Sequence, residues 1–139
     1  MFRVLDADSP ISKEDILQFE EILGKKLPES MLSFYLKYNG GQPQVMGVHD
    51  DRHLFPFNSF DSLDEMKKSL SWFDDEAVPA GFKATDLLHF AYDPGSGNYA
   101  LSLRAEDYGK VYFYVLEEKA ELYGQWPSFE DFLNSFVEE

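Results

Sequence analysis

The chain contains no cysteine and no long apolar run, and both absences narrow what it can be. Without cysteine it has no disulfide framework, no thiolate zinc site and no cysteine nucleophile, which suits a reducing cytoplasm. The first ten residues, MFRVLDADSP, hold no apolar segment of the kind that forms a signal peptide. No window has the apolar length of a membrane helix. We therefore expect a cytoplasmic protein that makes no use of a membrane.

Basic residues are scarce. Twelve Lys and Arg stand against 26 Asp and Glu, which gives a formal net charge of −14. A surface of this sign repels nucleic acid and anionic lipid, and it raises the encounter rate with basic proteins. We therefore expect a basic protein partner and no direct nucleic-acid binding. Acidity that serves solubility alone is the alternative.

A recognisable set of catalytic residues is also missing. The one metal-like grouping is HDDRH, which begins at His49 and ends at His53, with His89 as a possible outside ligand. Two imidazoles and two carboxylates could bind zinc in a small hydrolase or metal enzyme. The alternative is a solvated hairpin tip, because the motif falls in a turn between two extended segments.

The glycine-rich segment GSGN, residues 95–98, does not fit a phosphate site. A phosphate loop leads into a helix N-terminus, whereas this one leads from strand to strand. Ser96 is not the centre of a G-x-S-x-G nucleophile elbow either. Adjacent carboxylates are frequent in so acidic a chain, and no nucleophile, base and orienting group stand together. The sequence by itself therefore nominates no active site, and we expect no cofactor and no metal site.

What the sequence does contain is core-forming material. Hydrophobic residues make up 44% of the chain and aromatic residues 17%, so we expect one packed domain over residues 1–139. Four segments repeat apolar residues at helical spacing: 12–24, 28–38, 62–73 and 128–137. Ser12, Ser62 and Ser128 are placed to cap three of them, and Pro28 suits the first helical position of the other. In the last segment the apolar spacing continues to Val137.

Between these helices the pattern is that of strands. Residues 45–48 and 53–57 are short extended candidates, and LLHFAYD, YALSLR and VYFYVLEE form a predicted β-meander. In YALSLR, residues Tyr99, Leu101 and Leu103 share one face. VYFYVLEE is apolar on both faces, so it should be an interior strand. The acidic segment 74–86 is predicted as a loop. The fold class is α+β, with helices at both ends and a sheet dominated by antiparallel pairing.

The stretch KYNGGQP, residues 37–43, is predicted to end the second helix. Tyr38 lies on its last apolar turn, and Asn39 and Gly40 are residue types that tolerate a left-handed cap. Gly41 frees the exit of the chain, and Pro43 prevents the helix from starting again.

The order of these motifs resembles that of a known family. FEEILGKKLPESMLSFYLKYNGGQP, LLHFAYDPGSGNYALSL, GKVYFYVLEE and WPSFEDFLNSF follow one another as in the SUKH superfamily, in its Smi/Knr-like branch. One departure is visible: the family's compact D-x-G-G-N turn is here one residue longer and contains Ser96. The residues that carry the resemblance as a fold signature are Leu27, Pro28, Asn39, Gly40, Gly41, Pro43, Asp93 and Asn98.

The resemblance implies an α+β fold with a mixed, mostly antiparallel sheet and flanking helices, and it implies no known catalytic activity. Many bacterial members are immunity proteins that bind and neutralise a toxin, often a nuclease. Fungal relatives are adaptors in cell-wall synthesis and signalling. We therefore expect an immunity protein that binds a basic toxin, with an intracellular adaptor as the alternative. The expected contact residues lie on two acidic loops: Asp50, Asp51, Asp74, Asp75 and Glu76.

Overall fold

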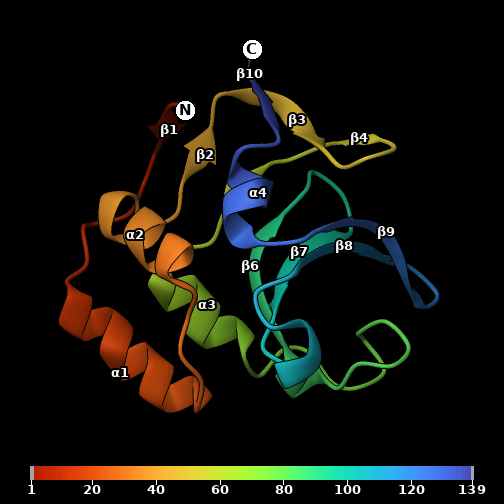
Figure 1. Cartoon of the computed structure of the whole chain (residues 1–139), viewed down its shortest axis with the longest axis horizontal. Coiled ribbons are helices and arrows are strands. Elements are labelled where there is room, and N and C mark those ends of the chain that lie inside the picture. The colour runs from red at the N-terminus through yellow and green to blue at the C-terminus, as the bar shows by residue number, and fades with distance from the viewer. Residues whose placement is uncertain (1, 139) are drawn as a thin grey trace.

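Antiparallel sheets organise the chain. A computed structural model describes residues 2–138, and Figure 1 shows it as helices beside a curved sheet. Within that range the strands form a five-stranded, a three-stranded and a two-stranded sheet, and the neighbouring strands in each sheet are antiparallel. The predicted α+β class, with antiparallel pairing dominant, is confirmed.

The largest sheet is a meander in the order β5-β6-β7-β8-β9. Its strands are β5 (Ser59–Phe60), β6 (Leu87–Tyr92), β7 (Gly97–Ser102), β8 (Val111–Leu116) and β9 (Ala120–Trp126). The three predicted meander strands are β6, β7 and β8, and β8 is interior as expected. Strand β9 was not predicted, because its apolar residues alternate poorly and its first half is exposed.

The smaller sheets join the two ends of the chain to its middle. They contain β1 (Val4–Leu5) with β2 (Gln42–Pro43), and β10 (Phe136–Glu138) with β3 (Val45–His49) and β4 (Leu54–Phe55). The prediction of a helix to Val137 is therefore wrong at its end, since Val137 pairs with Gly47. The side chain of Phe136 explains the change, because its ring packs 4.7 Å from that of Phe2 and 4.9 Å from that of Phe57.

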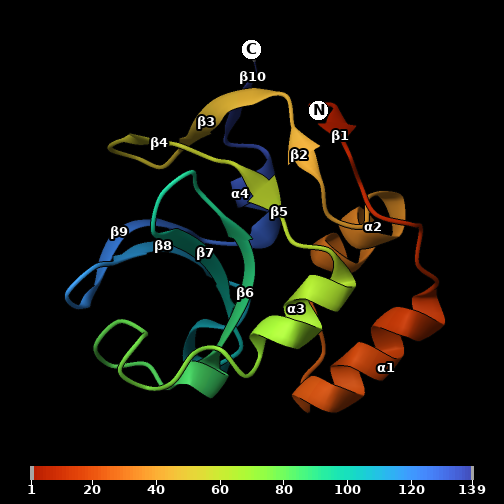
Figure 2. The same cartoon turned by 180° about the vertical axis from the view of Figure 1, so that it is seen from behind.

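The helices lie where they were predicted; the first has the predicted bounds, and the other three are shorter. They are α1 (Lys13–Leu23), α2 (Glu29–Lys37), α3 (Leu63–Ser69) and α4 (Phe129–Leu133). Capping boxes start α1 and α3, and Gly24 ends α1 in the left-handed conformation at φ 70°. Pro28 precedes α2 rather than opening it. Figures 1 and 2 show α1, α2 and α3 grouped beside the large sheet, with α4 near the middle of the molecule.

The large sheet is covered on both faces. One face packs on the helices through a core rich in aromatic residues, to which Tyr99, Leu101 and Leu103 belong as predicted. The other face carries a smaller cluster of Val78, Leu87, Ala100 and Tyr112, with Phe73 and Phe82 packed against it. Val78 and Phe82 come from the 74–86 segment. That segment is a loop, as predicted, apart from a 3-10 turn at Ala84–Asp86, and it covers this face of the sheet.

The KYNGGQP stretch is a junction between three parts of the chain. Its Asn39 is buried: the side-chain amide donates to Ser9 O at 2.7 Å and the side-chain oxygen accepts from Leu63 N at 2.9 Å. Gly40 has φ 78°, and a Cβ there would lie 2.7 Å from the backbone nitrogen of Ser62. The predicted left-handed cap at Asn39 is wrong, because α2 already ends at Tyr38 in an extended conformation. The glycines allow close chain approach instead.

Candidate functional site

The structure separates the two acidic loops that the sequence nominated. Asp50 and Asp51 lie in the turn between β3 and β4, whereas residues 74–76 follow α3. In Figures 1 and 2 these segments lie on opposite sides of the β8–β9 pair. They are thus not one patch, and each has to be considered with its own neighbours.

Asp50 is fixed by the turn that it closes. Its Oδ1 accepts from Arg52 N at 2.8 Å and from His53 N at 2.9 Å. Partial burial opposes ionisation, but these two N–H groups and that of Gln125 outweigh it, so the pKa of Asp50 is lowered. The carboxylate therefore stays charged at neutral pH, and Asp51 beside it is exposed.

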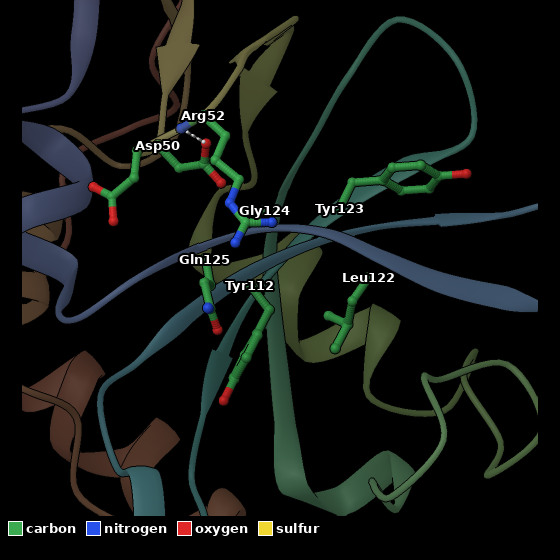
Figure 3. A pocket seen from close by; sticks show the side chains of 8 residues that line it. Asp50, Arg52, Tyr112, Leu122, Tyr123, Gly124 and Gln125 are labelled. Atoms are coloured by element: carbon green, nitrogen blue, oxygen red, sulfur yellow. Dashed lines mark hydrogen bonds between the residues drawn. The ribbon is translucent and has the colours of Figure 1, made fainter.

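A groove of about 310 Å³ lies between this turn and β9. We call it the β9 groove; it is lined by Asp50, Asp51, Arg52, Tyr112, Leu122, Tyr123, Gly124 and Gln125. Figure 3 shows Arg52 reaching from the turn across β9, while Tyr112 and Gln125 project from adjacent strands to the same side. The groove thus combines carboxylates, a guanidinium and tyrosine rings.

A β-bulge exposes the apolar residues of β9. Phe113 pairs with Gly124 and Tyr114 pairs with Leu122, which leaves Tyr123 as the extra residue. Leu122 is 47% exposed and Tyr123 is 52% exposed. Adjacent exposed apolar side chains in the middle of an edge strand are typical of protein interfaces.

Two contacts hold the β3–β4 turn against β9. The indole Nε1 of Trp126 donates to His49 O at 2.8 Å. A Cβ on Gly124 would lie 2.6 Å from the ring of Phe55, so only glycine lets the strand and the hairpin approach so closely. The groove is therefore a built feature of the fold.

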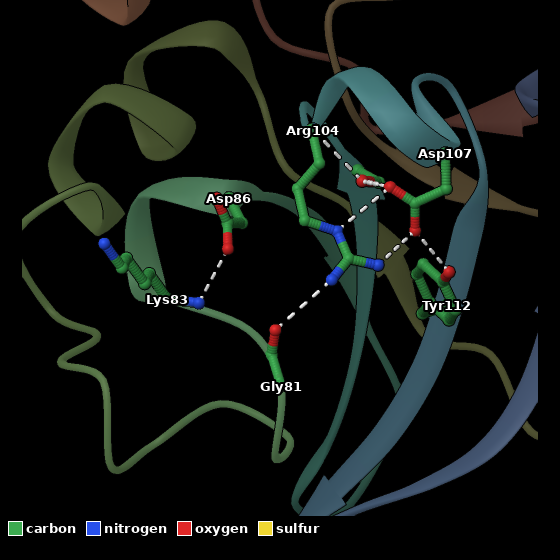
Figure 4. Close-up of polar contacts among 7 residues, drawn as sticks. Gly81, Lys83, Asp86, Arg104, Asp107 and Tyr112 are labelled. Carbon is green, nitrogen blue, oxygen red and sulfur yellow. Dashed lines mark hydrogen bonds and ion pairs between the residues drawn. The ribbon is translucent and has the colours of Figure 1, made fainter.

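A polar network fixes Tyr112 at the floor of the groove (Figure 4). The carboxylate of Asp107 accepts from Tyr112 Oη, Ser102 Oγ and the guanidinium of Arg104. Burial acts against it, but these donors hold the pKa of Asp107 well below its usual range. Arg104 also donates to Gly81 O at 3.2 Å and lies 4.0 Å from the ring centre of Phe82. One arginine thereby ties the 74–86 segment to the sheet.

Acidic side chains continue the β9 groove in both directions. A cavity of about 600 Å³ shares Asp51 and Gln125 with it, and one of about 200 Å³ at the β8–β9 turn shares Tyr123. We call the three together the β9 surface. Its charged residues are Asp50, Asp51, Arg52, Glu106, Asp107, Lys110, Glu117, Glu118, Lys119 and Glu121.

Asp74 and Asp75 bind backbone of their own loop. Asp74 Oδ1 accepts from Glu76 N at 3.1 Å and Ala77 N at 3.0 Å, and Asp75 Oδ1 accepts from Ala84 N at 2.8 Å. All three acidic side chains, including Glu76, are exposed. They lie outside the β9 surface, and their role in partner binding stays a prediction.

The histidines do not meet. His49 and His53 are exposed beside the β3–β4 turn, whereas His89 is buried in β6, with Nε2 2.7 Å from Tyr114 Oη. Burial lowers the pKa of His89 to about 3, so its ring is neutral at pH 7. Across residues 2–138 no three His, Asp or Glu side chains are grouped so that they could hold a metal ion. His89, the outside ligand considered for the HDDRH motif, thus lies in β6 and away from that motif.

Six residues that line the β9 groove were not nominated as contact residues from the sequence: Arg52, Tyr112, Leu122, Tyr123, Gly124 and Gln125. A signal was available in ELYGQW, where two bulky residues stand side by side before a glycine, as at a bulge. The pairing with Tyr112 depends on register across the hairpin, which residue types alone do not reveal.

The comparisons with known proteins agree with the resemblance seen in the sequence. The SMI1 / KNR4 family (SUKH-1) matches residues 10–135, which is most of the chain. No curated protein gave a match. In the part of the chain that the structure describes, no helix is long and apolar enough to cross a membrane.

Proposed function

Because the chain belongs to the SMI1 / KNR4 family (SUKH-1), we propose that it is a cytoplasmic, non-enzymatic immunity protein that binds and neutralises a basic toxin domain. The surface that we assign to the toxin is the β9 surface. Its acidic turn, Asp50 and Asp51, is part of the contact region expected from the sequence.

The observation that carries this proposal is the combination of exposed apolar side chains with an acidic surround. Leu122 and Tyr123 provide the apolar and aromatic centre that partner surfaces favour. Around them stand seven carboxylates, against the three cations Arg52, Lys110 and Lys119. One carboxylate, Asp107, is neutralised by Arg104. A negative excess therefore remains, which attracts and orients a basic partner.

The mode of action that follows is occlusion of a basic face. A nuclease toxin needs a cationic cleft for phosphate groups, and a carboxylate-rich surface of opposite sign can cover that cleft. The aromatic centre then supplies the contacts that slow dissociation. No chemical step by this chain is required.

Co-expression tests the proposal. Each basic domain encoded beside this gene is expressed in a host cell with and without the chain, and growth is recorded. We expect one such domain to arrest growth alone and to be tolerated together with the chain. If every neighbouring domain is harmless, or if the chain protects against none, the immunity proposal fails and the adaptor alternative gains weight.

The assignment to the β9 surface is tested by a charge change that spares the turn. Asp50→Asn keeps an oxygen for the N–H groups of Arg52 and His53, and Asp51→Lys alters an exposed side chain. Together they add three positive charges, and protection should be lost. The matched control, Glu14→Gln with Glu21→Lys on α1, adds the same charge far from the surface and should protect normally.

A further inference from the structure

A second groove lies outside the β9 surface and shares none of its lining residues. It has a volume of about 550 Å³ and runs between α3, the residues that follow it and the β6–β7 turn. We call it the α3 groove. The residues that matter here are Asp61, Glu65, Trp72, Phe73, Tyr92 and Leu116.

Its wall holds the most exposed large apolar side chain among residues 2–138. Trp72 is 69% exposed, and Tyr92, which also lines the groove, is 39% exposed. Phe73 beside it is fixed, because its ring stacks on that of His89 with centroids 3.7 Å apart. The groove thus contains an indole that is open to solvent, next to a phenylalanine ring that is held in place. Burial of that indole would favour folding, so its exposure calls for another explanation.

The charge inside the groove is negative and has no cation beside it. Asp61 and Glu65 are its acidic residues, no Lys or Arg lines it, and neither acid belongs to an ion pair in the described part of the chain. Burial, and then the charge of Glu65, raise the pKa of Asp61 to about 7. His89 does not compensate them, because it is neutral at pH 7.

We propose that the α3 groove receives a lysine or arginine side chain of a basic protein partner, with the cation between the indole of Trp72 and the carboxylate of Asp61. A cation is the group that gains most in this place. It relieves a partly desolvated carboxylate that has another acid as neighbour, and it binds favourably over the face of a tryptophan. A neutral or anionic group would gain neither interaction.

The inference goes beyond the proposed function, since it holds for any basic partner and can be tested without a toxin. The probe is the blocked tripeptide Gly-Arg-Gly, titrated at pH 8 so that Asp61 is ionised. The control peptide replaces arginine by citrulline, which has almost the same shape but no charge. The readout is the NMR signals of the two indole N–H groups.

We expect the Arg peptide to shift the signal of Trp72 and to leave that of buried Trp126 in place. The citrulline peptide should bind at least tenfold more weakly. Asp61→Asn and Trp72→Ala should each weaken the Arg peptide at least fivefold, whereas Glu121→Gln on the β9 surface should not. Equal binding of the two peptides, shifts at Trp126 instead of Trp72, or no effect of either groove variant would overturn the proposal.

Discussion

The carboxyl group of Asp61 lines a groove at the surface, yet its environment disfavours ionisation. It is largely buried beside a second acid, and its pKa is raised to about 7 from an ordinary value of 3.8. Because the unfolded chain loses this proton first, the group lowers the free energy of unfolding as pH rises from about 4 to about 7. Above pH 7 both states are ionised and the loss stays constant.

The first prediction concerns Asp61→Asn. The variant should be as stable as the parent near pH 4 and more stable by a few kcal/mol above pH 7, because each pKa unit corresponds to about 1.4 kcal/mol. Urea unfolding at a series of pH values measures this difference. The quantity to follow is the difference in unfolding free energy between variant and parent. The pKa of His89 is lowered to about 3, so His89 makes the stability of both proteins rise with pH below about 6.5, and this effect cancels in the difference. A difference that does not change with pH would contradict the burial of the Asp61 carboxyl.

Gly40 and Gly24 illustrate two different reasons why a position requires glycine: a positive φ angle and the close approach of another segment. Both have positive φ, at 78° and 70°, but only Gly40 faces a close chain: a Cβ there would meet the backbone of Asp61 and Ser62 within 3 Å. Gly24 has nothing within 4 Å.

The second prediction follows from that contrast. Gly24→Ala should cost about 1 kcal/mol of stability, the strain of a left-handed alanine. Gly40→Ala adds a backbone clash, so we expect it to cost at least about 2 kcal/mol more. Chemical denaturation of the two variants decides the matter. Equal costs would mean that the backbone at Gly40 does not pack closely on that of Asp61 and Ser62.

At the scale of helices and strands, the elements that were predicted correctly are those with a local sequence pattern. The starts of α1, α3 and α4 were predicted because Ser12, Ser62 and Ser128 act through residues three positions away. The meander strands were predicted because they alternate or are wholly apolar. Strands β1, β2, β5 and β10 are two or three residues long, and they exist through pairing with distant segments. Such pairing leaves no local pattern to read.

The end of the chain is the clearest case. Phe132, Leu133, Phe136 and Val137 fit a helix by spacing, yet α4 stops at Leu133. The last residues gain more by pairing β10 with β3 and by burying Phe136 among aromatic rings. Tertiary contacts here outweigh a valid helical pattern.

The third prediction tests that placement. Phe136→Ala should lower the free energy of unfolding by about 2 kcal/mol, less than for a fully buried Phe because the ring is half-buried. Glu138→Ala on the same strand is the control and should change stability by less than about 0.5 kcal/mol. Thermal or urea unfolding gives both values. A cost for Phe136→Ala no larger than the control's would refute the packing of β10 on the core.

At the scale of the whole molecule, composition predicts a class of partner but does not predict a contact surface. A charge of −14 on 139 residues indicates a basic partner. Turn chemistry pointed to Asp50 and Asp51, which lie on the β9 surface. The aromatic half of that surface depends on the register of β8 with β9 and on the bulge at Tyr123. The register is a property of the fold that no single segment encodes, whereas the bulge leaves a local signal in ELYGQW.

The charge of the whole molecule also affects the kinetics of binding. If charge draws the toxin to the β9 surface, the association rate must fall as salt screens the field, since the Debye length is about 10 Å at 0.1 M and about 3 Å at 1 M. The dissociation rate should depend mainly on the aromatic contacts at Leu122 and Tyr123. The association rate thus reports on the acidic residues of the β9 surface, and the dissociation rate reports on its apolar and aromatic residues.

The central claim is tested most directly by the association rate with the toxin domain that co-expression identifies, measured by stopped flow between 50 mM and 500 mM salt. We expect the rate of the parent chain to fall at least tenfold over this range. The Asp50→Asn, Asp51→Lys variant should start lower and depend less on salt, while the Glu14→Gln, Glu21→Lys control should follow the parent closely. An association rate indifferent to salt, or equal losses in the variant and the control, would contradict capture by the acidic β9 surface.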